Sequence, residues 1–207
     1  MPSVVEGRDA GPEIETARLI LRQWSDADLA AFAGINADAQ AMAHFPALLD
    51  RAESDALAWR WRRMFAERGF GMWAIEEKPA GGRVGTPFIG FVGLSVPLYE
   101  AAFTPCVETG WRLGPAWWGC GYASEAARAA LGFGFSEIGL AEIVAYTAVG
   151  NRRSRAVMER IGMRRDPADD FIHPLLPPGH RLSRHVLYRI GRAAFGKASP
   201  AGHERGG

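Results

Sequence analysis

The chain of 207 residues is expected to form an α+β fold of the α/β/α type. Several short runs alternate apolar and polar residues, which is the pattern of half-buried strands. Other runs repeat apolar residues every three or four positions, which is the pattern of amphipathic helices. Hydrophobic residues make up 48% of the chain and charged residues 23%, so the composition suits a globular domain with a sizeable core.

The patterns predict strands and helices in a fixed order along the chain. They are a strand over 16–24, a helix from 25 to about 36, a helix over 52–68, strands over 72–77, 88–96 and 107–113, a helix over 124–137, a strand over 143–149, a helix over 152–161, and a strand over 183–192. No internal repeat or linker interrupts this order, so we expect one domain.

In the first half of the chain, caps and faces support these assignments. Leu19 and Leu21 share one face of the first strand. Ser25 is the predicted N-cap of the first helix, followed by an acidic first turn. Trp61 lies on the apolar side of the second helix, and Gly69 is expected to end that helix.

The second half carries equally local signals. Residues 79–83 are expected to form a hairpin loop, and the nearly continuous apolar run 88–96 predicts a strand buried on both faces. The run 143–149 is rich in β-branched residues, which favours a strand. Asn151 is a good helix cap, and Gly162 is expected to end the helix that follows.

The domain is expected to span residues 14–192. Residues 1–13 and 193–207 are polar and rich in Gly and charge, which predicts disordered tails. The proline-containing segment 166–182 is expected to be a loop before the last strand.

Composition also excludes several functions. A net charge of +1 gives no reason to expect a nucleic-acid partner. No apolar run is long enough to span a membrane, and no leader sequence is evident, so a cytoplasmic location is expected. The 2 Cys are too few for a disulfide framework, and with the 5 His they never fall at zinc-ligand spacing, so no metal is expected.

The stretch Trp-Trp-Gly-Cys-Gly-Tyr-Ala-Ser-Glu-Ala at 117–126 joins a predicted strand to a predicted helix. Gly119 and Gly121 allow a tight turn and a close approach of the backbone to a ligand. The first turn of a helix offers unpaired N–H groups and a positive dipole end, which favour an anion. Since no Lys or Arg lies in this stretch, backbone donors would have to hold a pyrophosphate.

Other phosphate-binding motifs match this loop less well. A P-loop needs Lys and Ser/Thr after the second glycine, whereas Gly121 is followed by Tyr122 and Ala123. A dinucleotide fingerprint is nearly matched, but the acidic Glu142 starts the next strand instead of ending it. A glycine turn used only for packing stays open as the ordinary alternative.

Two motifs resemble the GNAT N-acetyltransferases. The first is Trp-Gly-Cys-Gly-Tyr-Ala-Ser-Glu-Ala at 118–126, in the form common among the RimJ/RimL-like subgroup. The second is Asn151-x-x-Ser154, followed by Glu-Arg-Ile-Gly-Met at 159–163. The opening Thr-Ala-Arg-Leu-Ile-Leu-Arg at 16–22 is also similar to the start of that subgroup, so the resemblance covers most of the chain.

The resemblance implies a GNAT fold and acetyl-CoA as co-substrate. The fold has a mixed, mostly antiparallel twisted sheet of about six or seven strands flanked by about four helices. Its two central strands splay apart, and the thioester lies in the gap. The resemblance implies as co-substrate-binding residues Trp111, Leu113, Trp118, Gly119, Cys120, Gly121, Tyr122, Ala123, Ser124 and Asn151.

The resemblance also implies direct attack of an amine on the acetyl thioester. Glu108 is the candidate base that removes the amine proton, or else an exposed strand carboxylate. Many members of the family use a Tyr as acid where this chain has Met158, so Ser154 is the candidate donor to the leaving sulfur. Its alternative is a helical serine bonded to its own backbone. His173 is a candidate contact to the acceptor, or a loop histidine packed on Pro174.

The function expected from the resemblance is therefore transfer of an acetyl group from acetyl-CoA to a primary amine. The acceptor, a protein N-terminus or a small-molecule amine, is not identified by the sequence. A homodimer is among the assemblies that the family implies. The alternative is a non-catalytic module that binds acyl-CoA on the same fold, which the missing Tyr at Met158 favours.

Overall fold

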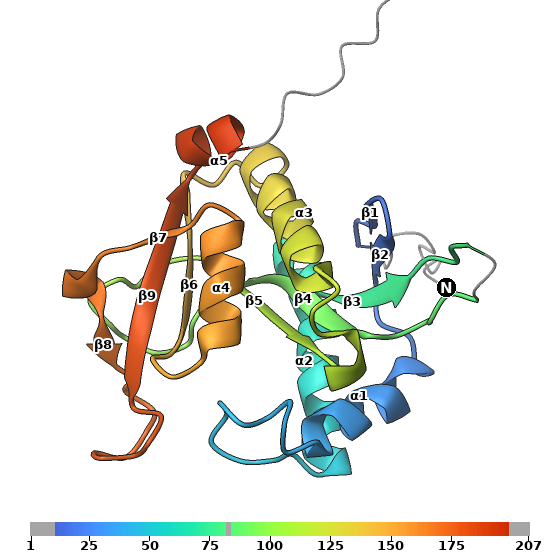
Figure 1. The fold of residues 1–207 in the computed structure, drawn as a ribbon, viewed down its shortest axis with the longest axis horizontal. Coiled ribbons are helices and arrows are strands. Elements are labelled where there is room, and N and C mark those ends of the chain that lie inside the picture. The colour runs from blue at the N-terminus through green and yellow to red at the C-terminus, as the bar shows by residue number, and fades with distance from the viewer. Residues whose placement is uncertain (1–10, 82–83, 199–207) are drawn as a thin grey trace, which may run out of the picture.

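A 9-stranded sheet runs through the protein, and helices cover both of its faces (Figure 1). The computed structural model describes residues 11–81 and 84–198. The strands are β1 (Ile14–Glu15), β2 (Leu19–Arg22), β3 (Met72–Glu77), β4 (Gly90–Ser95), β5 (Glu108–Leu113), β6 (Glu142–Ala148), β7 (Arg164–Arg165), β8 (Phe171–Ile172) and β9 (Arg184–Gly191). The helices are α1 (Asp28–Ala37), α2 (Arg51–Arg68), α3 (Tyr122–Ser136), α4 (Arg152–Arg160) and α5 (Arg192–Ala198), with short 3₁₀ turns η1 (Pro115–Trp117) and η2 (Pro167–Asp169).

The sheet is mixed and mostly antiparallel, as predicted. Its strand order is β1-β2-β3-β4-β5-β6-β9-β7, and β8 also pairs with β9. All of the pairs are antiparallel except β5 with β6. The long crossover through α3 makes that parallel pair possible, because parallel neighbours cannot be joined by a hairpin.

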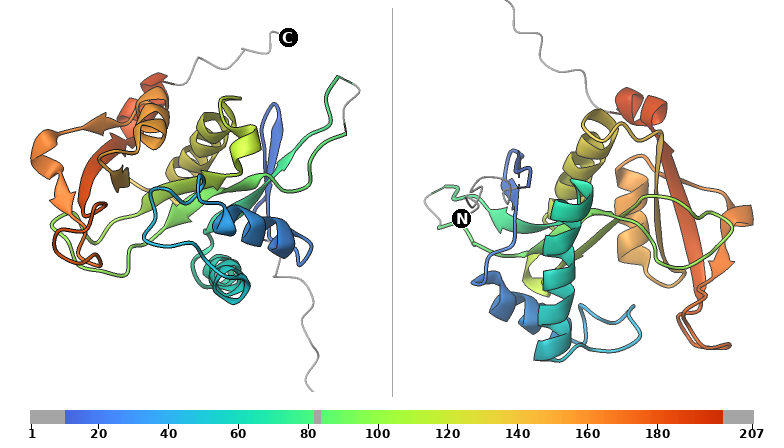
Figure 2. Two further views of the ribbon diagram at one scale, coloured as in Figure 1. Left: turned by 60° about the horizontal axis from the view of Figure 1, so that its bottom comes forward. Right: turned by 180° about the vertical axis from the view of Figure 1, so that it is seen from behind.

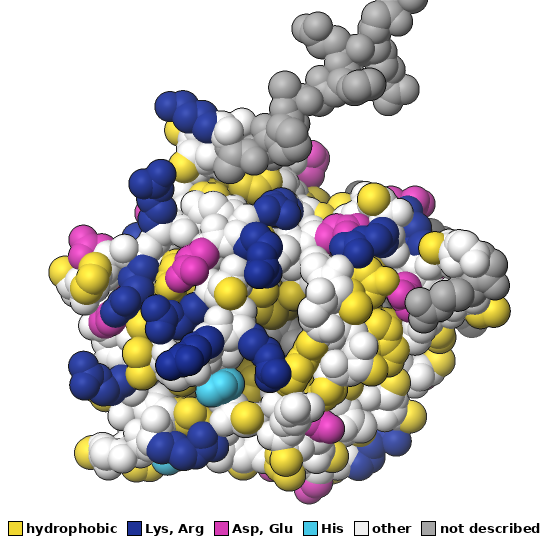
Figure 3. All heavy atoms as spheres, viewed as in Figure 1, with side chains coloured by type: hydrophobic (Ala, Val, Ile, Leu, Met, Phe, Trp, Pro, Cys, Tyr) yellow, Lys and Arg dark blue, Asp and Glu magenta, His cyan; other side chains and the backbone are white. Residues whose placement is uncertain are grey.

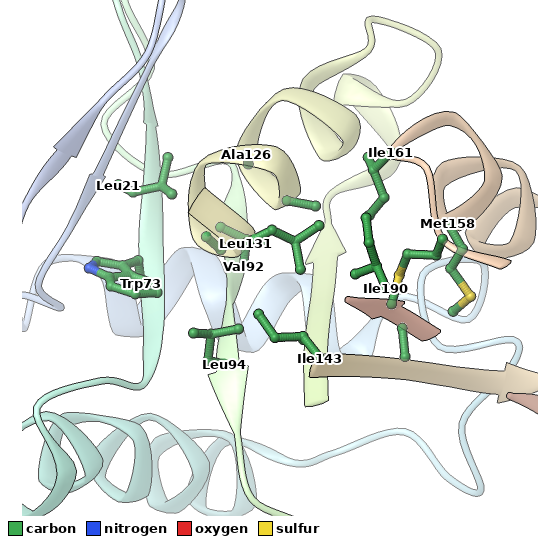
Figure 4. Close-up of a cluster of buried hydrophobic side chains, with 14 of the residues drawn as sticks. Leu21, Trp73, Val92, Leu94, Ala126, Leu131, Ile143, Met158, Ile161 and Ile190 are labelled. Atoms are coloured by element: carbon green, nitrogen blue, oxygen red, sulfur yellow. The ribbon is translucent and has the colours of Figure 1, made fainter. Parts of the chain in front are cut away.

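The main hydrophobic core lies between the sheet and the face covered by α3 and α4. Ala126 and Leu131 of α3 face Val92 and Leu94 of β4 and Ile143 of β6 (Figure 4). All five side chains have no exposed surface. This packing fixes the start of α3 over the middle of the sheet, beside the place where β5 ends.

A second, aromatic core lies on the opposite face, under α1 and α2 (Figure 2). Trp61 of α2 and Phe91 of β4 have ring centroids 4.2 Å apart, and Phe32 of α1 lies 5.4 Å from Trp61. These two helices cover the β2–β4 half of the sheet. The β6–β9 half of the same face is left to connecting loops (Figure 2).

Most of the predicted elements are confirmed. Leu19 and Leu21 are fully buried, and β4 is buried on both faces, as their patterns indicate. Helix α2 begins with a capping box at Asp50 and ends at Gly69, whose φ of 74° is left-handed. Asn151 caps α4 with its side chain, as predicted.

The start of α1 differs from the prediction. No side chain caps this helix, which begins at Asp28 with Ala27 at the N-cap position. The Asp28 carboxylate instead accepts the backbone N–H of Ser25 at 2.7 Å and pairs with Arg22 at 2.8 Å. Asp28 is only 2% exposed. The sequence pattern placed its carboxylate in the acidic first turn of the helix, whereas in the structure it forms the ion pair that closes the β2–α1 connection.

Three further boundaries differ. Helix α3 begins two residues earlier than predicted, at Tyr122. The segment 166–182, which was predicted to be a loop, contains the strand β8, because residues 171–172 pair with the edge of β9. The expected disordered tail begins with helix α5, where Phe195 packs on Phe135 with ring centroids 5.2 Å apart. Residues 199–207, most of the expected N-terminal tail and part of the 79–83 loop lie outside the described residues.

Candidate active site

The loop between β5 and α3 has the glycine geometry that its sequence predicts. Gly119 has a φ of 80° and Gly121 a φ of 83°, both in the left-handed region. A side chain at either position would strain the backbone. Nothing lies within 4 Å of the place where a Cβ of Gly119 would sit, so the backbone here is open to a ligand.

The first turn of α3 offers unpaired backbone donors. Gly121 stands at the N-cap position, and no side chain caps the helix. The first intrahelical bond runs from Glu125 N–H to Gly121 C=O at 3.1 Å, which leaves the N–H groups of Tyr122, Ala123 and Ser124 without helical acceptors. Among the described residues, the buried Ser124 Oγ also lacks a partner. These donors fit a phosphate group.

Cationic side chains reach this loop from distant segments. Arg18 donates to the Cys120 carbonyl at 2.9 Å and pairs with Glu125 at 2.6 Å. Arg153 of α4 lies over the Trp118 ring, 4.4 Å from its centroid. Figure 3 shows Lys and Arg side chains gathered on the face of α3 and α4. Nothing within the loop sequence indicates these cations, because they come from segments distant in the chain.

A hollow of about 520 Å³ adjoins the start of α3. Its lining includes three arginines, one glycine of the loop and the unpaired serine, namely Arg18, Arg128, Arg160, Gly121 and Ser124. Beside the unpaired amides, three arginines and one carboxylate, Glu125, line this open surface, so the site is electropositive on balance. The arrangement fits the diphosphate of a nucleotide-like ligand.

Side chains of the loop anchor it to the neighbouring strands. The Trp118 indole donates to the Leu113 carbonyl at 2.9 Å, and the Tyr122 hydroxyl donates to Glu77 at 2.6 Å. Cys120 is exposed. Leu113 was expected to bind the co-substrate arm through its main chain, and the Trp118 indole already donates to its carbonyl. Of the two main-chain groups of Leu113, the N–H is the one left for that role.

Strands β5 and β6 pair over a short length and then separate. Among the described residues, Glu108 and Val144 form their one registered pair, beside a bond from Val144 N–H to Val107 C=O at 3.0 Å. On the opposite edge of β5, the N–H of Gly114 donates to the carbonyl of Ile89, the residue before β4, at 3.0 Å. Because main-chain groups alternate along a strand, those of Trp111 face the gap toward β6. The predicted splay is confirmed.

Glu108 lies beside the point where the two strands part. Ser95 Oγ donates to its carboxylate at 2.6 Å. Burial raises the pKa of Glu108, and hydrogen bonds from Ser95 and Tyr146 oppose that rise. A carboxylate with a raised pKa accepts a proton more readily than an ordinary one, so its environment fits a general base.

Six partly exposed rings gather next to Glu108, and we call them the aromatic cluster: Tyr99, Phe103, Tyr146, Phe171, His173 and His185. His173 lies 4.9 Å from Tyr99 and 4.8 Å from His185 between ring centroids. Burial lowers the pKa of His185 to about 4 and also lowers that of His173. Both imidazoles are therefore neutral at neutral pH.

The aromatic cluster is assembled from the β4–β5 connection, β6, β8 and its following residues, and β9. Of these rings, only His173 was predicted from the sequence as a candidate contact to the acceptor. The other five rings carry no shared spacing, so nothing in the sequence announces that they meet. Strand β8, which the sequence did not predict, pairs Phe171 with His185 and thereby brings two of the rings together.

Asn151 and Ser154 form one capping unit. Asn151 Oδ1 accepts the Ser154 N–H at 3.3 Å, and Asn151 Nδ2 donates to Ser154 Oγ at 3.1 Å and to Thr147 Oγ1 at 2.9 Å. Because Ser154 Oγ accepts in this unit, its own proton is free to be donated. Met158 points into the core with 2% exposure, so no acidic group stands at that position.

The chain belongs to the GNAT acetyltransferase family. The family model described as "Acetyltransferase (GNAT) domain" matches residues 18–164. The Bacillus subtilis (strain 168) protein YkkB is 33% identical over 159 residues, covering 75% of this chain and 87% of that protein. The N-acetyltransferase YnaD of the same organism is 32% identical over 177 residues, covering 86% and 95%.

Solved structures agree with this assignment. An acetyltransferase from Agrobacterium tumefaciens str. C58 has 27% sequence identity and a TM-score of 0.66, covering 86% of this chain and 94% of that one. The fold is thus the GNAT fold, and the family is one of acyltransferases. None of the described helices is both long and apolar enough to cross a membrane.

Proposed function

We propose that this protein is an N-acetyltransferase that moves the acetyl group of acetyl-CoA directly to a primary amine. The observation that carries the proposal is one continuous arrangement. An anion-binding helix start lies at the end of β5, and the gap between β5 and β6 opens beside it. The form of the 118–126 loop favours the RimJ/RimL-like subgroup, whose acceptors are protein N-termini, while relatives acetylate small amines.

The backbone around the loop would hold the co-substrate. The amides of residues 119–124 fit its diphosphate, and Arg18 and Arg153 add positive charge at the same surface. The main-chain groups of Trp111 face the gap and would pair with the pantetheine arm as a strand edge pairs with an added strand. Acetyl-CoA supplies the activated acyl group when bound.

Glu108 would remove the proton from the attacking amine. A protonated amine has no lone pair, and an α-amine has a pKa of about 8, so proton removal at neutral pH is a modest demand. The raised pKa of Glu108 brings the base closer to the amine in proton affinity. The Glu108 side chain lies at the closed end of the gap, where amine and thioester would meet.

Ser154 would assist the departing thiolate. Its hydroxyl proton is not used in the capping unit with Asn151, and it lies at the start of α4. A thiol with a pKa of about 8.5 also leaves without a strong acid, so we expect the contribution of Ser154 to be small. The buried Met158 contributes no proton.

One observation favours a second candidate, a non-catalytic module that binds acyl-CoA. The position where many relatives place an acidic Tyr is occupied by Met158, which is buried in the core. On this hypothesis the loop still binds acyl-CoA, but Glu108 and Ser154 have no chemical role.

The test is a thiol-release assay with acetyl-CoA against N-terminal peptides and small amines, combined with calorimetry of CoA binding. We expect CoA binding and turnover with at least one amine class. Absence of CoA binding would overturn both candidates. CoA binding without turnover across the panel, unchanged by Glu108→Gln and Ser154→Ala, would favour the non-catalytic module.

A further inference from the structure

Arg112 of β5 is a buried cation without a carboxylate partner. Arg112 is only 8% exposed. Its Nη1 donates to the amide oxygen of Asn36, while its buried Nε has no acceptor in the described part of the chain. None of the ion pairs formed within 11–81 and 84–198 includes Arg112.

Burying the charge of Arg112 in this way costs free energy. A buried charge loses its hydration and is normally compensated by an opposite charge. Here the compensation comes from two aromatic faces, with the guanidinium 3.9 Å from the Phe45 centroid and 5.4 Å from that of Phe91. Burial lowers the pKa of Arg112 to about 10, so the cost is only partly offset.

The position of Arg112 relates it to the proposed chemistry. Side chains alternate along a strand, so Glu108, Gly110 and Arg112 lie on the same face of β5. Their neighbour across the gap on that face is Tyr146, two residues beyond the Glu108–Val144 pair. Gly110, between the candidate base and the cation, has no side chain, and the methyl group of Met72 would lie 3.5 Å from a Cβ at that position.

The connection from α1 to α2 covers Arg112. Phe45 in this connection lies on the guanidinium, and the neighbouring Ala43 carbonyl accepts a bond from Arg181 at 3.0 Å. His44 carries a second buried group, Nδ1, that has no partner among the described residues. The connection therefore covers Arg112 and carries an unsatisfied polar group of its own.

We infer that Arg112 binds a carboxylate of the amine acceptor, so that the acceptor is a small amino acid-like molecule with both an amine and a carboxylate. The inference rests on the proposed function and narrows it. Four residues of strand separate Glu108 from Arg112, which places their Cα atoms about 13 Å apart. Both side chains are long, so the separation between their charged ends can be much shorter, and an amino acid would bridge it with its amine toward Glu108 and its carboxylate toward Arg112.

The first experiment compares amino acids with their carboxamides as acceptors. The pair shares the amine and side chain and differs in the carboxylate. An uncharged carboxamide has the more easily deprotonated amine, so a preference for the acid runs against intrinsic reactivity. We expect Arg112→Met to lower kcat/KM for the acid by at least about tenfold, mainly through KM, and to leave the amide unchanged.

Two further variants serve as controls. Arg112→Lys keeps the charge and should retain part of the preference for the acid. Arg63→Met removes an arginine from the exposed surface of α2 and should leave both rates unchanged; the Arg63 side chain is 77% exposed. Equal rates for acid and amide in the wild type, or equal losses on both in Arg112→Met, would overturn the inference.

Stability separates substrate binding from a structural role. Replacing a buried, unpaired charge with an apolar side chain is neutral or stabilising, so Arg112→Met should keep or raise Tm. A fall in Tm together with unchanged selectivity would show a structural role instead.

Product binding tests the inference without turnover. Calorimetry with N-acetylphenylalanine and its carboxamide should show tighter binding of the acid, lost in Arg112→Met. If CoA binds and neither product does, the carboxylate site is wrong while the proposed function stands. If no amine is acetylated but the acid still binds through Arg112, the proposed transfer is wrong while the carboxylate site stands.

Discussion

The proposed co-substrate side and the proposed acceptor side of this protein are built in opposite ways. Backbone groups from one continuous stretch, residues 119–124, dominate the first side. Side chains from the α1–α2 connection, the β4–β5 connection, β5, β6 and β8–β9 dominate the second. Backbone amides tolerate many side chains, whereas recognition by side chains changes with each substitution. The comparison implies that the loop defines the family and the opposite face defines the acceptor.

The largest effect is expected on the acceptor side, at the candidate base. Glu108→Gln keeps the shape of the side chain but removes its proton affinity, so kcat/KM should fall by about 10²- to 10⁴-fold. CoA binding should be unchanged, because Glu108 lies away from the loop. The assay is steady-state thiol release, with Glu137→Gln, an exposed carboxylate at the end of α3, as the matched control. An activity loss below tenfold would remove Glu108 as the base.

The next effect is expected on the co-substrate side. Gly121→Glu puts a side chain at a φ of 83° and an anion at the diphosphate site, so CoA affinity should fall by about 100-fold or more. The control is Gly69→Glu, which has a similar φ of 74° and open space around it at the end of α2. Calorimetry measures both variants. Equal CoA affinity in the two would place the diphosphate elsewhere.

A smaller effect is expected at Ser154. Ser154→Ala removes the hydroxyl proposed to assist the thiolate, and since a thiol leaves readily, kcat should fall by about tenfold or less. The Asn151 Nδ2 group would lose one acceptor but keep Thr147 Oγ1. A loss as large as that of Glu108→Gln would give Ser154 a central role in the chemistry.

The smallest effect is a shift in the pH profile. Hydrogen bonding by Tyr146 lowers the pKa of Glu108, so Tyr146→Phe should raise that pKa further. The base must be ionised to act, so the acid limb of kcat/KM should move to higher pH. Tyr188→Phe is the control, because its hydroxyl bonds to Glu159 at 2.8 Å instead. A shift to lower pH would contradict the assigned contact.

The same comparison explains which parts of the site were predictable. The glycine loop, the start of α3 and the cap at Asn151 depend on residues within a few positions of each other, so their geometry follows from local rules. Glu108 was named as a candidate because it lies on the strand that leads into the loop. Arg18 and Arg112 were not named, since their contacts are distant in sequence: Arg18 bonds Cys120, and Arg112 bonds Asn36.

The fold errors have the same origin. Ser25 was predicted to cap α1 by a local rule, but the ion pair of Asp28 with Arg22 prevailed. Residues 193–198 look like a tail by composition, yet they form α5, because Phe195 finds Phe135 on α3. Tertiary contacts contribute enough free energy to override weak local preferences.

By itself, the sequence determined the order of the main strands and helices, the glycine-bent entry to α3 and the pattern of apolar faces, because each of these depends on neighbouring residues. Only the tertiary structure decided where β5 and β6 separate, which rings gather beside Glu108, and that Arg112 is buried without an opposite charge. Those features depend on the burial and the partners of side chains far apart in the chain. Contacts between such distant residues produce no regular spacing pattern in the sequence.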